Sequence, residues 1–176
     1  MSNIYVTSDT HFGHKAMLDW VDSEGYLRRG EHWDTVEQMN ATIVDNWNSV
    51  VGPKDTVYHL GDVFYGSKTS FLESWRQLNG VKHLVLGNHD DSAFFIKNNL
   101  VKSVKLFHKD KALGVILSHM PLREETMYDL HNVHGHLHYR LAPETGRHTC
   151  VSLEQTNYKP ICLESLSKSL RERYTL

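Results

Sequence analysis

Cysteine, net charge and long apolar runs are all scarce in this chain. Its 176 residues include only Cys150 and Cys162, which lack the spacing of a metal or redox motif. Lys and Arg number 19 against 21 Asp and Glu, so the formal net charge is −2. Because proteins that coat long nucleic acid carry a basic excess, we do not expect that role. The longest apolar run, near residues 112–117, is far shorter than the roughly 20 residues that span a membrane.

Signals for secretion are also absent from the sequence. The opening residues, MSNIYVTSD, contain no basic stretch followed by an apolar run, so we expect no signal peptide and no membrane partner. With so few cysteines, a reduced compartment such as the cytoplasm is expected. The composition, 40% hydrophobic and 23% charged, is typical of a globular protein and excludes disorder, collagen and coiled coil. We expect a single domain spanning residues 1–176.

Strand patterns alternate with helical patterns along the chain. Capping boxes at Asp34/Glu37 and Ser70/Glu73 predict the starts of two helices. A His-Lys-Asp-Lys turn between residues 101–107 and 112–118 predicts an antiparallel hairpin. The other predicted elements are strands at 3–8, 56–60, 83–86, 132–133 and 149–153, and helices at 34–50, 70–78, 91–99 and 163–174. Together they predict an α/β fold with mixed sheets.

Thirteen histidines are present, and several stand in polar clusters where a predicted strand ends. In open α/β sheets, ligand sites form beyond the carboxyl ends of strands, so clusters distant in sequence can meet there. Asp, His and Asn suit divalent Mn, Fe or Zn, whereas the lack of cysteine argues against a closed structural zinc site. The clusters are Asp9-Thr10-His11, Gly61-Asp62, Gly87-Asn88-His89-Asp90, Ser118-His119 and Gly135-His136-Leu137-His138.

The clusters offer two Asp, one Asn and four His as candidate ligands. One ion takes about four protein ligands, so seven are too many for a single ion. Two ions that share one bridging carboxylate fit this number. A pair of ions about 3.5–4 Å apart can clamp the attacking and leaving oxygens of an in-line displacement at phosphorus. Water bound between two cations also loses a proton readily, so no separate base is needed.

The order of the clusters resembles the calcineurin-like metallophosphoesterase superfamily, from residue 5 to about residue 140. The stretches Ser8–His14, Tyr58–Asp62 and Asn157–Pro160 are similar to a small stand-alone bacterial and phage branch. The resemblance implies an α/β fold of two mixed β-sheets packed as a sandwich and flanked by helices, the four-layer α/β/β/α arrangement. It also implies two divalent metal ions as cofactors, with Mn favoured and Fe, Zn or Ni as alternatives.

The resemblance further implies the role of each cluster residue. One ion would take Asp9, His11, Asp62 and His138. The other would take Asp62, Asn88, His119 and His136, with Asp62 bridging. His89 matches the family's non-ligand histidine beside the phosphate and the leaving-group oxygen, and we expect Asp90 to orient its ring. The sequence departs from many relatives, which carry an Asp or Asn shortly after Gly-Asp, where residues 63–66 here read Val-Phe-Tyr-Gly.

These features predict a phosphodiesterase for a small or nucleotide-type phosphate ester. A nuclease and a phosphomonoesterase of the same chemistry are the alternatives. A non-catalytic binding module, as a retromer subunit of this superfamily has become, ranks last because all seven ligands and His89 are present. The oligomeric state stays open, a dimer included.

Candidate residues for substrate binding lie outside the metal motifs. His14 follows the first cluster and could reach a substrate phosphate. Arg28 and Arg29 form a pair suited to bidentate phosphate binding, and Arg123 follows His119, although arginines in irregular stretches are more often solvated. Tyr65 could stack on a base, although an aromatic residue after a strand is more often part of the core.

Overall fold

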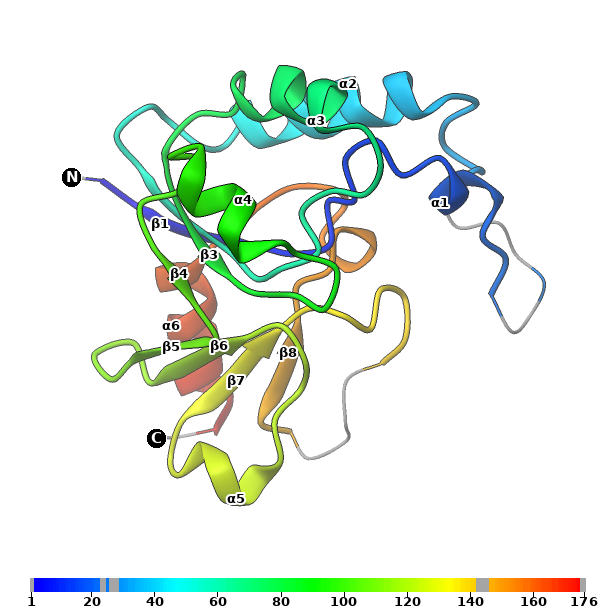
Figure 1. Ribbon diagram of the computed structural model, residues 1–176. Helices are drawn as coiled ribbons and strands as arrows, with labels where there is room; N and C mark the ends of the chain where they lie inside the picture. The colour runs from blue at the N-terminus through cyan, green and yellow to red at the C-terminus, as the bar shows by residue number, and fades with distance from the viewer. Residues whose placement is uncertain (1, 23–24, 26–28, 142–145, 175–176) are drawn as a thin grey trace.

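The computed structural model describes residues 2–22, 25, 29–141 and 146–174. In these residues two β-sheets face each other, and helices flank them (Figure 1). One sheet has the strand order β4-β3-β2-β1-β9 and the other the order β5-β6-β7-β8. The strands are β1 Ile4–Thr7, β2 Thr56–His59, β3 Val81–Val85, β4 Val104–Lys105, β5 Phe107–Asp110, β6 Val115–Ser118, β7 His131–His134, β8 His148–Cys150 and β9 Ile161–Cys162. Both sheets are mixed, since β9 and β5 run antiparallel to their neighbours and the other pairs are parallel. The predicted sandwich of two mixed sheets is confirmed.

Two layers of apolar side chains hold the elements together. Trp47, Phe71 and Trp75 are buried between helices α2 (Val36–Asn48) and α3 (Lys68–Trp75) and the outer face of the five-stranded sheet. Val6 and Leu117 belong to a second cluster that joins the two sheets. Burying each such side chain contributes about 1.5–3 kcal/mol. The helices are α1 Ala16–Asp19, α2 Val36–Asn48, α3 Lys68–Trp75, α4 Ser92–Lys97, α5 Glu124–Met127 and α6 Leu163–Tyr174.

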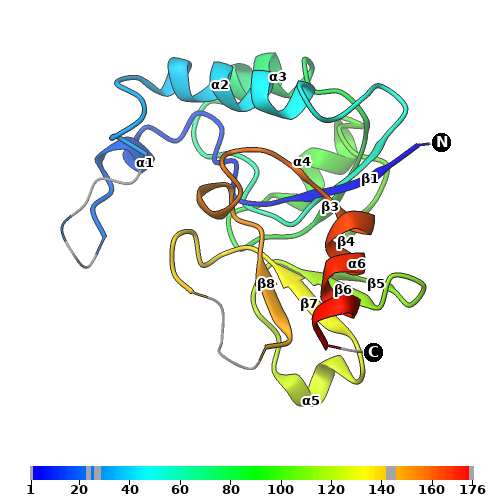
Figure 2. The same cartoon turned by 180° about the vertical axis from the view of Figure 1, so that it is seen from behind.

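Figures 1 and 2 show α2 and α3 side by side over the five-stranded sheet, with α5 at the opposite end of the molecule. The predicted C-terminal helix is present as α6, which lies beside β1 and β9. None of the helices in the described ranges combines the length and the apolar character that crossing a bilayer requires.

Helices α2 and α3 begin at caps other than those predicted. Helix α2 has its capping box at Thr35 and Gln38, one residue after the predicted pair. Helix α3 begins after Ser67, whose side chain accepts a hydrogen bond from the Ser70 backbone N–H. The cap residue must have an extended backbone while its side chain turns back onto the first turn, and Thr35 and Ser67 meet this condition.

The predicted hairpin between residues 101 and 118 is wrong in its first arm. Strand β4 pairs in parallel with β3, whereas β5 contains most of the predicted turn and pairs antiparallel with β6. The chain therefore passes from one sheet to the other near Leu106. Gly114, which has a φ of 71°, closes the actual turn because glycine adopts this conformation without steric cost.

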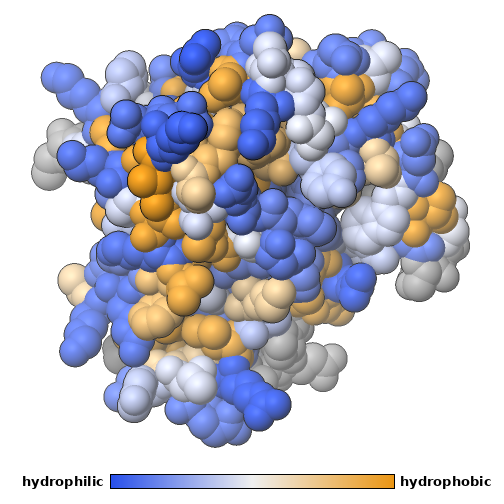
Figure 3. Space-filling model, viewed as in Figure 1, coloured by the Kyte–Doolittle hydropathy of each residue, from blue (hydrophilic) through white to orange (hydrophobic). Residues whose placement is uncertain are grey.

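This crossing leaves apolar side chains at the surface. Leu106 is 74% exposed and Phe107 is 53% exposed. In the view of Figure 3, which is that of Figure 1, apolar groups are interspersed with polar ones on the side of the molecule that carries β4 and β5. Both residues lie outside the lining of the cavity described below.

The parallel strands bring the polar clusters to one end of the sandwich. The loops after β1, β2 and β3 follow neighbouring strands of one sheet, and those after β6 and β7 follow neighbours of the other. The two sets of loops are in contact where Gly135 lies against Ser8 and Asp9. The approach is so close that a Cβ added at Gly135 would overlap the Ser8 hydroxyl. The backbone N–H of His136 donates to Asp9 Oδ2 at 2.9 Å. Glycine at position 135 therefore permits the two sheets to meet.

We predict that Gly135→Ala lowers the free energy of unfolding by about 3 kcal/mol, the upper range for overpacking, because both strand ends are fixed. Gly114→Ala is the matched control. Its Cβ would meet nothing within 4 Å, so only the strain of its φ remains, about 1–2 kcal/mol. Denaturant unfolding of the chelated proteins measures both values. A loss at position 135 no larger than at position 114 would contradict this account of the junction.

Candidate metal centre

The backbone is strained at five of the predicted ligands. Among the described residues, nine other than glycine have a positive φ. Such residues are uncommon, and each costs about 1–3 kcal/mol unless the surrounding structure enforces it. Strain of this kind gathers at functional sites. The predicted ligands concerned are Asp9, His11, Asp62, His136 and His138.

Asp9, His11 and His138 form one group of candidate ligands whose donor atoms lie within 4.8 Å of one another. Asp9 Oδ1 is 4.0 Å from His11 Nε2 and 3.8 Å from His138 Nε2. Both Asp9 Oδ1 and His11 Nε2 are buried without a hydrogen-bond partner. Buried polar atoms normally have partners, and a cation bound between them would supply one. The first group therefore fits a metal ion.

A second group contains Asp62, His119 and His136, with Asn88 beside it. His119 Nε2 lies 3.5 Å from Asp62 Oδ2, 2.9 Å from Asn88 Oδ1 and 3.1 Å from His136 Nδ1. His119 Nδ1 lies 2.7 Å from the Leu60 carbonyl, which can only accept. In a neutral ring the proton is therefore on Nδ1, and Nε2 presents a lone pair to the other three side chains.

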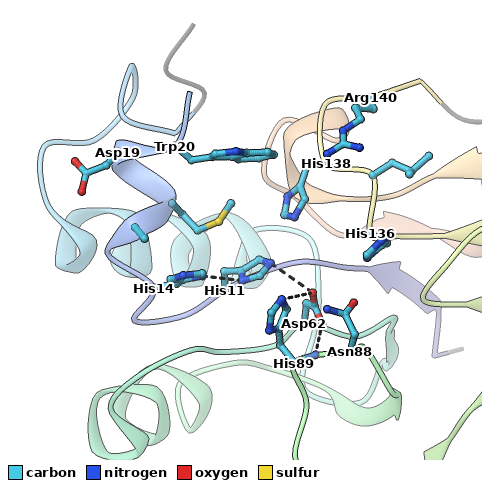
Figure 4. A pocket seen from close by; sticks show the side chains of 13 residues that line it. His11, His14, Asp19, Trp20, Asp62, Asn88, His89, His136, His138 and Arg140 are labelled. Carbon is cyan, nitrogen blue, oxygen red and sulfur yellow. Dashed lines mark hydrogen bonds and ion pairs between the residues drawn. The ribbon is translucent and has the colours of Figure 1, made fainter. Parts of the chain in front are cut away.

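The Asp62 carboxylate faces both groups. Its Oδ2 is 3.8 Å from His11 Nε2 of the first group and 3.5 Å from His119 Nε2 of the second. Figure 4 shows Asp62 in the middle of the site, between His11 and Asn88. The structure thus brings all seven predicted ligands together, and the set of carboxylate, imidazole and amide donors suits divalent Mn, Fe or Zn.

Burial lowers the pKa of three histidines in and beside the site. It lowers the pKa of His11 well below the usual 6.5, and it also lowers the pKa of His14 and His136. The positive charge of Arg29 adds to this effect at His11, and the adjacent His119 ring adds to it at His136. A neutral imidazole keeps a lone pair, so these residues retain their capacity to bind a cation near neutral pH.

Asp90 connects two of the loops that carry ligands. Its carboxylate accepts backbone hydrogen bonds from Asp62, Val63 and Gly87 at 2.9, 3.0 and 2.8 Å. Burial raises the pKa of Asp90, and the three N–H donors oppose that rise. We expected Asp90 to orient the His89 ring, but its oxygens hold the loops after β2 and β3 against each other instead.

Arg29 was predicted to bind substrate, and its position excludes this role. The side chain is fully buried. Its Nε donates to Glu154 Oε1 at 2.8 Å, and its terminal nitrogens donate to the carbonyls of Thr10 and Asp9. Two adjacent arginines in an irregular stretch suggest exposed side chains. The Arg29 guanidinium instead packs against the backbone of the Asp9-Thr10-His11 cluster.

Glu154 links Arg29 to the candidate ligand His138. Its Oε1 also lies 3.0 Å from His138 Nδ1. Burial alone would raise the pKa of Glu154, but Arg29 and His138 hold it at about 2. A carboxylate on the far nitrogen fixes the ring of a metal-binding histidine. No sequence pattern indicated this role, because residue 154 follows the predicted strand 149–153 and lies in a 3₁₀ turn, Leu153–Gln155, after β8.

The remaining described residues that were predicted to bind substrate do not gather at one place in the structure. His14 lines a cavity of about 550 Å³ over the ligands, and its Nδ1 lies 3.1 Å from His11 Nδ1. Tyr65 is 50% exposed, and its ring lies tilted against that of His14 with the two centroids 4.4 Å apart, so its assignment to the core is wrong. Arg123 is exposed at the start of α5 and does not line the cavity. Arg28 lies outside the described residues.

Comparison with known proteins identifies the family. The sequence profile of the calcineurin-like phosphoesterase family matches residues 2–170, so the chain belongs to that family. It is therefore a metal-dependent hydrolase of phosphate esters, and the two groups of candidate ligands agree with this class.

The similar proteins match different shares of this chain. An uncharacterised protein of Methanocaldococcus jannaschii is 30% identical over 181 aligned residues, 98% of this chain and 93% of that protein. The gene 66 protein of Mycobacterium phage L5 is 39% identical over 93 residues, covering 51% of this chain and 41% of its own length. The crystal structure of a protein of unknown function from Aquifex aeolicus has a TM-score of 0.71 and 26% identity, covering 96% of this chain and all of that one.

We predict that Glu154→Gln lowers the free energy of unfolding of the metal-free protein by about 3 kcal/mol or more, because Arg29 loses its buried counter-ion. The exposed Glu125→Gln, as control, should change it by less than about 0.5 kcal/mol. The carboxylate stabilises the fold when ionised, so the deficit should be full above the ordinary pKa of 4.5 and shrink as the pH falls towards 2. Denaturant unfolding across this pH range measures it. Equal stability of the Glu154 variant and wild type at neutral pH would refute this role.

Proposed function

We propose that the protein is a dinuclear metal-dependent phosphodiesterase acting on a small or nucleotide-type phosphate ester. One observation carries the proposal: two groups of candidate ligands face a single carboxylate, Asp62, on the wall of one cavity. Mn²⁺ is the favoured metal, with Fe, Zn or Ni as alternatives.

The assignment of ligands follows the two groups. Asp9, His11 and His138 would hold one ion, and Asn88, His119 and His136 the other, with Asp62 shared. When bound, two such cations supply Lewis acidity and an activated water for an in-line displacement at phosphorus. The shared Asp62 carboxylate would offset the repulsion between two cations, since it faces both ligand groups.

His89 is the candidate for assisting the leaving group. Its backbone N–H donates to Asp62 Oδ1 at 3.1 Å, which fixes the residue beside the centre. Its ring belongs to neither ligand group, and 43% of the side chain is exposed to the cavity side. With Nε2 4.0 Å from Asp62 Oδ2, the ring can hold a proton next to a phosphate seated on the centre and give it to the departing oxygen.

The charges of the cavity favour a diester. Among the described residues that line it, Arg140 is the only lysine or arginine. A diester carries one negative charge. A monoester dianion carries two, and its binding would require more basic groups in the cavity. His14 would add a hydrogen bond to a phosphate oxygen. A nuclease for long nucleic acid is less well supported, since the net charge of −2 supplies no long-range attraction.

We expect the purified protein, loaded with Mn²⁺, to hydrolyse bis(4-nitrophenyl) phosphate and to lose this activity on chelation. Restoring Mn²⁺ should restore the activity. The release of nitrophenolate measures the rate, and 4-nitrophenyl phosphate is the matched monoester. Full activity after exhaustive chelation would refute the proposal, and a higher kcat/KM for the monoester would replace the diesterase with a phosphomonoesterase.

We predict that His89→Ala retains the metal but loses about 10²–10⁴ in rate, the usual contribution of a positioned general acid. The loss should be larger for an alkyl leaving group than for nitrophenolate, because an alkoxide needs a proton as it departs. Metal analysis and rates on methyl 4-nitrophenyl phosphate and a dialkyl diester test this. Loss of an ion, with equal rate losses on both substrates, would make His89 a ligand instead.

A further inference from the structure

The cavity extends beyond the candidate ligands and His89. At about 550 Å³ it lies within the range of roughly 300–1,000 Å³ that holds a ligand of drug size. The remaining part of its wall comes from α1 and the loop after β7, with Met17, Trp20, Leu137 and Arg140 among its residues. None of these four has a place in the metal chemistry. They are therefore available to contact the organic part of a substrate whose phosphate lies on the centre.

We propose that this wall is a subsite for a nucleoside base, which stacks on Trp20. The inference rests on the proposed function and narrows its substrate to a nucleotide diester of small size. It assigns Trp20 as the residue that determines specificity and Arg140 as the partner of a polar or charged group beside the base.

Trp20 is held next to the candidate metal centre. Its ring centroid lies 5.1 Å from that of His138, edge to face, and 5.2 Å from that of Tyr139. Figure 4 shows the Trp20 indole beside His138, with His11 and His14 below it in this view. A ring against Trp20 is therefore only a short distance from a phosphate on Asp62 and His89.

The side chains of this wall favour a nucleoside base over an alkyl chain. The indole presents a broad aromatic surface, and sequence-tolerant stacking of bases on such surfaces is a common mode of nucleotide binding. Arg140 is exposed at the cavity rim beside His138 (Figure 4) and offers a planar set of donors for a base edge or a second phosphate. An alkyl chain would leave these donors unused. Asp19, the acidic residue of this wall, lies on the other side of Trp20 from Arg140.

Two substrates with the same leaving group test the subsite: thymidine 5′-(4-nitrophenyl) phosphate and methyl 4-nitrophenyl phosphate. Wild type should have the higher kcat/KM for the thymidine diester. Trp20→Leu keeps apolar bulk but loses the aromatic plane, so it should lower that value about 5- to 150-fold, with little change for the methyl diester. Trp20→Phe should retain most of the preference. Tyr65→Leu removes an aromatic ring that does not line the cavity, and should leave the ratio of the two substrates unchanged.

Metal content and product binding separate this inference from the proposed function. Trp20→Leu should keep the metal content of wild type, and calorimetry should show weaker binding of thymidine 5′-monophosphate to the Mn²⁺-loaded variant. If neither substrate is hydrolysed but this weakening is seen, the proposed function fails and the subsite stands. Equal losses on both substrates, or loss of metal, would mean that Trp20 only supports His138. A Leu variant equal to wild type on the thymidine diester would also overturn the subsite.

Discussion

The site depends on how one carboxylate, that of Asp9, joins the two sheets. Asp9 follows β1 of the five-stranded sheet, and its Oδ2 accepts hydrogen bonds from His136 N–H and from the Ser152 hydroxyl, at 2.9 and 2.8 Å. His136 follows β7 and Ser152 lies just after β8, so both donors come from the other sheet. With Oδ2 occupied, Oδ1 is left facing His11 and His138 without a hydrogen-bond partner. The contact that closes the sandwich therefore also aims one ligand atom at the first candidate metal position.

Keeping such a site in the metal-free fold is costly. Asp9 and Asp62 are buried, and both carry left-handed backbone conformations. Hydrogen bonds from backbone N–H groups and the fully buried Arg29–Glu154 pair offset part of this cost. The orphaned atoms Asp9 Oδ1 and His11 Nε2 remain uncompensated, and a bound cation would satisfy both. Metal binding and folding stability should thus be linked, since anything that binds only the native state stabilises it.

The sequence predicted the polar clusters well, because each lies in a short segment directly after a strand and their order matches a known family. It did not predict what lies behind them. Glu154 reaches His138 only because the chain turns after β8, and no local pattern marks a glutamate in such a turn. Arg29 was misassigned for the complementary reason: its partners are backbone carbonyls and a glutamate 125 positions away in the sequence. Local patterns also placed two caps wrongly, at Asp34 and Ser70 instead of Thr35 and Ser67, since neighbouring polar residues offered equally plausible starts.

The cavity has two parts that are supported differently by the fold. The candidate ligands lie at the ends of hydrogen-bonded strands, and Asp90 and Arg29 tie their loops together from behind. Trp20 and Arg140 instead lie on connecting segments, one after the four-residue helix α1 and one after β7. Connections tolerate sequence change more readily than strand ends under such constraints. Relatives with the same hydrolytic centre can therefore differ in the organic group that they accept, and the substrate of this chain must be inferred from α1 and the loop after β7 rather than from the ligands.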